Sequence, residues 1–127
     1  MTVERQALGR LAEDYVARRL TCAGWAILER NARPGGYRGE LDIVARHGRE
    51  LVFVEVKARS TRAVAGPPSP VLAVDRRKQA QLRRLAAAWL RQEEISERFA
   101  GLRFDVAGVW VEPGGMVAGW EYLRAAF

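Results

Sequence analysis

Three charged side chains interrupt two apolar, strand-forming runs of this sequence. Asp42 lies in the first run, and Glu55 and Lys57 lie in the second. Burying an isolated ion costs several kcal/mol or more, so charges within apolar strands need partners. A divalent cation is one such partner, because Mg²⁺ or Mn²⁺ accepts carboxylate oxygens together with water and substrate phosphate. The pattern therefore predicts a metal-dependent nuclease site, with Asp42 and Glu55 as the metal ligands.

The expected turn between the two runs decides whether these side chains can meet. Side chains alternate across a strand, so Glu55 and Lys57 share one face, and Glu40 and Asp42 share one face. A two-residue loop beginning at position 47 would pair residue 42 with 53, and a four-residue loop would pair residue 42 with 55. Either register brings both pairs onto the same face. Only an odd-length loop without a compensating bulge would separate them.

Each residue of the predicted site has a chemical role. A bound metal would polarise a phosphoryl oxygen and acidify a water, and Lys57 would orient that water, deprotonate it or stabilise charge on phosphorus. Glu13, on the first expected helix, is either a further carboxylate for the metal or a solvated residue. Glu40 is either a supporting group or simply exposed. Gln79 either reaches the site or phosphate, or lies at a helix margin.

Basic residues are concentrated in one segment of the chain. The 21 Lys and Arg residues exceed the 15 Asp and Glu residues, and positions 57–92 hold nine of the former against Asp75 alone. Such a charge run is either a solvated helix face or a surface for nucleic acid. We expect the following residues to contact nucleic acid: Arg59, Arg62, Arg76, Arg77, Lys78, Arg83 and Arg84.

The elements that must position these residues follow from hydrophobic periodicity and turn signals. The sequence predicts one α/β domain over residues 1–127, with a mixed central sheet flanked by helices in the order α-β-β-β-α-β-β. The expected elements lie at residues 4–23, 25–30, 40–46, 51–58, 75–94, 103–111 and 117–123. Gly24 would end the first helix, and Asp75 would cap the second. Residues 60–74, rich in proline, are expected to form a mobile loop.

Composition narrows the class of protein. The 127 residues contain one cysteine and one histidine, which exclude an internal disulfide and a zinc site of the Cys/His kind. No apolar run approaches the ~20 residues of a membrane span, and the N-terminus lacks a secretory pattern, so we expect a cytoplasmic protein without membrane contact. The alternatives to a nuclease are a non-catalytic nucleic-acid-binding module and a protein-interaction subunit.

A family resemblance joins these observations. Asp42, followed thirteen residues later by Glu55-Val56-Lys57, resembles the PD-(D/E)xK nuclease superfamily, with Leu41 in place of the hallmark proline. The chain is more closely similar to the YraN-like family of small bacterial proteins, which is related in fold to archaeal Holliday junction resolvases. The matching positions span nearly the whole chain: Gly9, Glu13, Ala17, Leu20, Gly24, Asn31, Gly39 to Asp42, Phe53 to Arg59, Lys78, Gln79, Ala126 and Phe127.

The resemblance implies a restriction endonuclease-like fold and a Mg²⁺- or Mn²⁺-dependent endonuclease. In that case Asp42 and Glu55 are metal ligands, Lys57 is the catalytic lysine, and Glu13 corresponds to the first-helix acid of the resolvase-like branch. The implied substrate is DNA, with branched or structured DNA favoured over a particular sequence. Resolvases of this group are dimers, so the resemblance also allows a homodimer.

Overall fold

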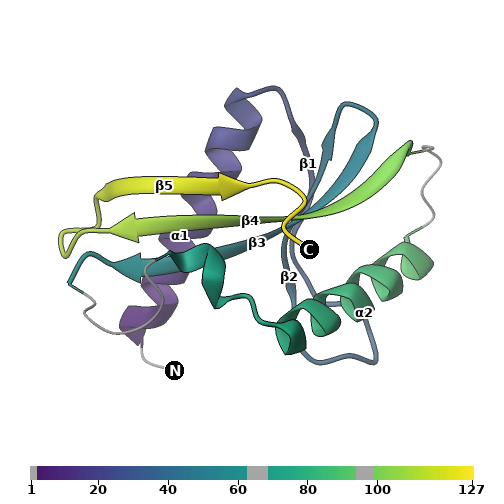
Figure 1. Ribbon diagram of the computed structural model, residues 1–127, viewed down its shortest axis with the longest axis horizontal. Helices are drawn as coiled ribbons and strands as arrows, with labels where there is room; N and C mark the ends of the chain where they lie inside the picture. Colours follow the sequence, from purple (N-terminus) through teal and green to yellow (C-terminus); the bar gives the residue numbers. More distant parts are fainter. Residues whose placement is uncertain (1–2, 63–68, 94–98) are drawn as a thin grey trace.

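The computed structural model describes residues 3–62, 69–93 and 99–127. Figure 1 shows the elements in chain order: α1 (Val3–Cys22), β1 (Ala26–Ala32), β2 (Leu41–His47), β3 (Glu50–Ser60), the 3₁₀ helix η1 (Pro70–Ala73), α2 (Arg76–Gln92), β4 (Gly101–Val111) and β5 (Val117–Leu123). The α/β class and the predicted order are confirmed, and η1 is the addition. Within the expected loop, residues 63–68 lie outside the described part, as does the expected last helical residue, Glu94.

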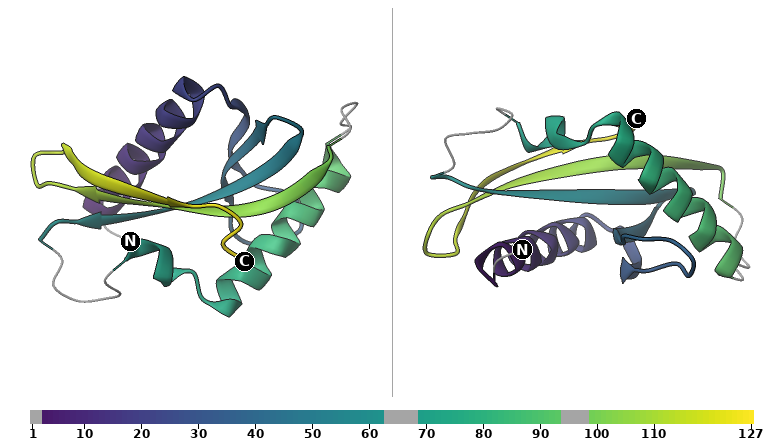
Figure 2. Two further views of the ribbon diagram at one scale, coloured as in Figure 1. Left: turned by 45° about the horizontal axis from the view of Figure 1, so that its top comes forward. Right: turned by 90° about the horizontal axis from the view of Figure 1, so that it is seen from below.

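One mixed sheet holds the five strands in the spatial order β1-β2-β3-β4-β5. The strands β3 and β4 run parallel and are connected through α2, whereas the other neighbouring pairs are antiparallel. The helix α1 crosses one face of the sheet and α2 crosses the other, as the edge-on view in Figure 2 shows. The central strands are therefore covered on both faces, which explains the unbroken apolar run of β3.

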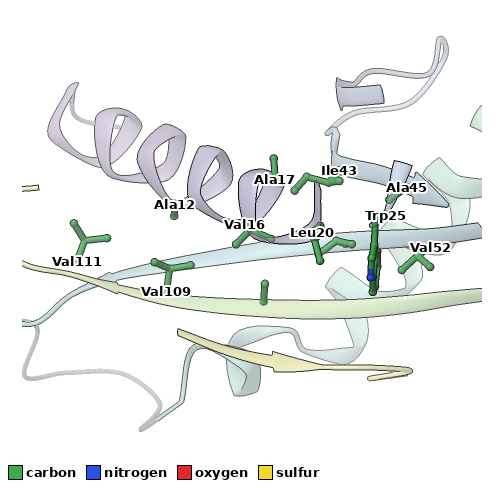
Figure 3. Packing of buried hydrophobic residues seen from close by; sticks show 12 residues of the cluster. Ala12, Val16, Ala17, Leu20, Trp25, Ile43, Ala45, Val52, Val109 and Val111 are labelled. Carbon is green, nitrogen blue, oxygen red and sulfur yellow. The ribbon is translucent and has the colours of Figure 1, made fainter. Parts of the chain in front are cut away.

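Two buried clusters fill the space between the sheet and the helices. Beneath α1 most of the packed side chains are small or branched, with the indole of Trp25 among them (Figure 3). Beneath α2 it includes stacked and edge-on aromatic rings of Phe53, Trp89 and Phe104. On β3, Val52 and Val54 belong to the α1 cluster while Leu51 and Phe53 belong to the α2 cluster. By the same alternation, Glu55 and Lys57 project toward α2.

Both predicted helix ends are present. Gly24 has a φ of 91°, and the amide of Trp25 donates to the carbonyl oxygen of Leu20 at 3.0 Å, which is a glycine-ended helix terminus. Asp75 caps α2, because its carboxylate accepts from the amide of Lys78 at 2.9 Å. No helix in the described ranges combines the length and the apolar character needed to cross a membrane.

The β2–β3 hairpin turns at Gly48 and Arg49, with His47 paired to Glu50. Gly48 has a φ of 60°, a conformation that favours glycine in a tight hairpin. The turn has two residues, as in one predicted alternative, but it starts one position later. The register is therefore that of the other alternative, because pairing of residue 43 with 54 continues to place residue 42 opposite 55.

A fully buried carboxylate on β4 ties the C-terminal segment to the sheet. Asp105 is 0% exposed and accepts from Nε of Arg103 at 3.0 Å, the hydroxyl of Tyr122 at 2.6 Å and the amide of Ala125 at 2.9 Å. Arg103 also donates to Glu50 at 2.7 Å. Burial and the adjacent carboxylate raise the pKa of Tyr122, so its hydroxyl remains a donor. Within the described residues, Arg103, Tyr122 and the backbone of Ala125 together satisfy the Asp105 carboxylate.

Candidate metal centre

Asp42 lies where β2 parts from β3. The last regular pair of the hairpin is Ile43 with Val54, and beyond it the carboxylate Oδ2 of Asp42 accepts from the amide of Val56 at 2.8 Å. The side chain thus accepts the hydrogen bond that a strand carbonyl would otherwise receive. Asp42 is only 9% exposed. This interruption of the strand pairing lets one carboxylate meet groups from both faces of the sheet.

Glu55 presents a buried oxygen to two lysines. Its side chain is 4% exposed, and its Oε2 lies 3.3 Å from Nζ of Lys78 on α2 and 3.7 Å from Nζ of Lys57 on β3. That oxygen accepts no hydrogen bond from the described residues. The Glu55 carboxyl also lies close enough to that of Asp42 to raise its pKa. Two carboxyl groups and two ammonium groups therefore converge at one point of the sheet.

A second group of carboxylates adjoins Asp42 from the α1 side. One oxygen from each of Glu13, Glu40 and Asp42 lies within 4.8 Å of the others. Asn31 connects two of them, because its Nδ2 donates to Glu13 at 2.6 Å and to Glu40 at 3.2 Å. Arg33 forms an ion pair with the other oxygen of Glu40 at 3.1 Å. The cluster thus joins acids from α1, the start of β2 and the segment before it.

The electrostatics of this cluster favour an added cation. Burial, then the hydrogen bond and charge of Glu55, raise the pKa of Asp42 to about 9, against the lowering effect of the Val56 amide. Burial also raises the pKa of Glu13, although its hydrogen bond from Asn31 acts in the opposite direction. Closely spaced carboxyl groups with raised pKa values are ones at which a divalent cation can take the place of protons. Their oxygen-only chemistry suits Mg²⁺ or Mn²⁺.

The segment that leads into β2 is fixed by α2. Nε2 of Gln81 donates to the carbonyl oxygen of Arg38 at 3.2 Å. The next residue, Gly39, has a φ of 98°, and a Cβ there would lie 2.6 Å from the same Nε2. A glycine therefore satisfies both the left-handed backbone and the close approach of the helix. This contact sets the direction in which Glu40 leaves the turn.

The structure brings together Asp42, Glu55, Lys57, Glu13 and Glu40 as neighbours. It places the side chain of Gln79 elsewhere, since its Nε2 donates to the carbonyl oxygen of Val74 at 3.2 Å. Its predicted supporting role stays a prediction.

Two further residues of the site were not predicted as such. Lys78 reaches Glu55, and its predicted contact with nucleic acid stays a prediction. Asn31 holds Glu13 and Glu40. In the sequence, Lys78 could have been found from its position three residues after the predicted cap Asp75. That position places Lys78 in the first turn of α2. The signal for Asn31 was an amide in a turn-rich segment, and its φ of 52° is one that asparagine tolerates.

The predicted nucleic-acid residues lie mainly along α2 and at the end of β3. Arg62, Arg76, Arg77 and Arg84 are exposed, and Arg59 is half-buried. The guanidinium of Arg83 lies 5.0 Å from the ring centroid of Phe104, which holds it against the sheet. Because Lys78 shares the first turn of α2 with Arg76 and Arg77, a positive helix end adjoins the carboxylates.

We expect Asn31→Gly to weaken Mn²⁺ binding about 10- to 100-fold, which is typical for loss of a group that orients metal ligands. Glycine removes the amide that holds Glu13 and Glu40 while accepting the φ of 52°. Calorimetric titration with Mn²⁺ measures the affinity. Arg33→Ala is the matched control, because its side chain is 79% exposed and forms an ion pair with Glu40. Equal losses in the two variants would contradict the role of Asn31.

Comparison with known proteins places the chain in a family. Residues 12–109 match the model of the uncharacterised protein family UPF0102. A UPF0102 protein of Moorella thermoacetica is 42% identical over 127 residues, covering all of both chains. A second, from Parafrankia sp., is 46% identical over 122 residues, with 96% of this chain and 97% of the relative covered.

Among solved structures, that of Pyrococcus furiosus SfsA in complex with Ca²⁺ is 16% identical, with a TM-score of 0.33, and the match covers 93% of this chain and 62% of SfsA. The family model agrees with the YraN-like resemblance of the motifs. So do the relatives, which match over nearly their full length. The chain therefore belongs to the uncharacterised protein family UPF0102.

Proposed function

We propose that this protein is a Mg²⁺- or Mn²⁺-dependent endonuclease that hydrolyses phosphodiester bonds of DNA. The observation that carries the proposal is a group of carboxyls beside a lysine: buried Asp42 lies beside the oxygens of Glu13 and Glu40 and close to buried Glu55, which forms an ion pair with Lys57 at 3.7 Å. Burying two acids next to a lysine costs folding free energy, which a bound ligand would offset. The resemblance to PD-(D/E)xK nucleases gives the same residues a common purpose.

The residues divide the chemistry between them. Asp42 would hold the ion with Glu55, and the positions of Glu13 and Glu40 suit either direct or water-mediated contact. When bound, the ion supplies Lewis-acid polarisation of phosphate and a more acidic water. The side chain of Lys57 is 30% exposed and held by Glu55. As a neutral amine it would accept a proton from that water, and as an ammonium it would orient the water or stabilise charge on phosphorus.

The basic surface supports a polyanionic substrate. Arg76, Arg77 and Arg84 are exposed on α2, the helix whose Lys78 contacts Glu55. Contacts of this kind read the phosphate backbone and not base edges, so we propose that DNA structure, such as a branch, directs the enzyme. Binding should then weaken steeply as salt concentration rises. A homodimer, as in the resolvases, would suit a branched substrate and is part of the same proposal.

The Asp42→Asn variant tests both the metal and the reaction. We expect the wild type to cleave branched DNA in Mg²⁺ or Mn²⁺ and not in EDTA. Asp42→Asn should not cleave it under any of these conditions. The metal-free variant should also melt a few degrees higher than the wild type at pH 8. Asparagine keeps the shape of Asp42 and, like its protonated form, carries no charge beside Glu55.

The pH dependence has a definite sign. A carboxyl whose folded pKa is raised keeps its proton while the unfolded chain loses it. The metal-free wild type should therefore lose stability as pH rises from about 4 to about 9, by up to roughly tenfold in the folding equilibrium per pH unit. Asp42→Asn should show a flatter profile by thermal melting. A variant with the wild-type slope would contradict the buried-acid assignment. If metal stabilises the wild type but the protein cleaves no DNA, the site is a metal centre and the proposed nuclease activity is wrong.

A further inference from the structure

A second concave surface lies on the opposite flank of α1 from the acidic cluster. A cavity of about 840 Å³ opens between the C-terminal half of α1 and β5, in the size range of small-ligand sites. Figure 1 shows these two elements crossing. Glu13 faces Asn31 at the end of β1, whereas Tyr15 and Arg18 line the cavity on the β5 side. The cavity is thus separate from the candidate metal centre.

Aromatic rings form the floor of the cavity. Trp120 of β5 meets Tyr15 of α1 edge-on, with 5.8 Å between ring centroids and an interplanar angle of 79°, and Tyr122 lies 5.8 Å from the same indole. Trp120 and both tyrosines are partly exposed, whereas Trp25 beneath them is buried. Rings held rigidly by one another in a partly open cavity form a platform on which another flat ring can stack.

The rim of the cavity is positively charged. Arg18, Arg19 and Arg124 line it, and no acidic residue does. Arg19 lies 5.2 Å from the ring centroid of Trp120, and Arg124 lies 5.8 Å from that of Trp25. Within the described ranges no carboxylate forms an ion pair with these three arginines. Guanidinium groups that stack on aromatic rings and lack a carboxylate can bind phosphate.

We propose that this cavity binds an unpaired nucleotide of a single-stranded nucleic acid, with the base on Trp120 and the adjacent phosphates on Arg18, Arg19 and Arg124. Aromatic platforms bordered by arginine are the usual means of binding single strands without sequence preference. A membrane or acidic peptide would use the arginines but gains little from the flat platform. The inference goes beyond the proposed cleavage and depends on binding alone.

The experiment measures fluorescence anisotropy of a labelled oligothymidylate of about twelve nucleotides in EDTA, where cleavage is excluded. We expect Trp120→Ala to weaken binding about 5- to 150-fold, Trp120→Phe to retain most of it, and Arg18→Ala with Arg19→Ala to weaken it and lower its salt dependence. Arg10→Ala is the matched control, because Arg10 is an exposed arginine of α1 outside the cavity. Because EDTA excludes cleavage, the outcome of this assay is independent of that of the catalysis test.

A chemical test avoids the risk that Trp120→Ala fails to fold. Cys22 is the one cysteine of the chain, it is exposed, and it lines the cavity. A bulky maleimide on Cys22 should weaken oligonucleotide binding at least as much as Trp120→Ala does, leaving only the contribution of the basic surface of α2. The same label on Cys22→Ser with Glu112→Cys, in the β4–β5 turn, should leave it intact. The proposal is overturned if labelled Cys22 protein binds normally. It is also overturned if polyglutamate or free thymidine monophosphate competes as well as unlabelled oligonucleotide.

Discussion

Replacing Asp105 by alanine is expected to lower the free energy of unfolding by about 3–5 kcal/mol, the usual loss when one member of a buried ion pair is removed. Asp105 is 0% exposed, and its carboxylate accepts from Arg103, Tyr122 and the amide of Ala125. Alanine leaves all three donors without this acceptor. The guanidinium of Arg103, 10% exposed, would retain Glu50 as its ion-pair partner. Urea unfolding followed by circular dichroism measures the change.

The control for Asp105→Ala is Tyr122→Phe. That variant removes one donor from the same carboxylate and leaves the ion pair with Arg103, so we expect a loss of about 0.5–1.5 kcal/mol. Similar losses in the two variants would show that the ion pair contributes no more than one hydrogen bond. Among the described residues, none of the hydrogen bonds of Asp105 and Tyr122 involves a carboxylate of the candidate metal centre. Mn²⁺ affinity without denaturant should therefore stay near that of the wild type in both variants.

Lys57→Met is expected to lower the metal-dependent cleavage rate by about 10²–10⁴-fold, which is the range for a lost proton-transfer group. Methionine keeps the length and apolar stem of the lysine but removes the ammonium that lies 3.7 Å from Glu55. Binding of Mn²⁺ should persist, because the carboxylates remain. Single-turnover cleavage at saturating protein measures the rate independently of DNA affinity.

The matched variant is Lys78→Met, since Lys78 contacts the same oxygen of Glu55 at 3.3 Å. Lys78 lies on α2 with the exposed arginines, so its loss should raise KM more than it lowers kcat. Lys57→Arg should not restore the rate fully, because a guanidinium does not accept a proton near neutral pH. A larger fall in kcat for Lys78→Met than for Lys57→Met would exchange the roles of the two lysines.

The local pattern of the sequence was enough to predict the elements and one half of the site. Strand alternation placed Glu55 and Lys57 on one face, and the cap at Asp75 predicted where α2 begins. Those inferences depend on neighbours in the chain, whose geometry is regular. The sequence left two possible registers for the hairpin. It could not decide between them, because the residue at which the turn starts depends on which backbone conformation has the lowest free energy.

Contacts between distant segments were beyond local reasoning. Lys78 meets Glu55 only because β3 and β4 pair in parallel and bring α2 back over the sheet. Asn31 reaches Glu13 because α1 crosses that face at one particular angle. In the sequence, the fully buried Asp105 has a local partner in Arg103, two residues earlier on the same strand. Nothing local indicates that Tyr122 and Ala125 would also donate to it. The count of charged residues also placed the expected nucleic-acid surface on α2, and it gave no sign of the cavity beside β5.

The parallel pairing of β3 with β4 has a consequence for how the protein acquires its site. Their paired residues, such as Glu50 with Gly101, lie about fifty positions apart, so a long loop must close before any of that pairing is gained. The β2–β3 hairpin can form early, which brings Asp42 opposite Glu55. Lys78 cannot reach them until α2 has docked on the sheet. A chain that has formed the hairpin but not docked α2 therefore holds the two acids together without the second lysine.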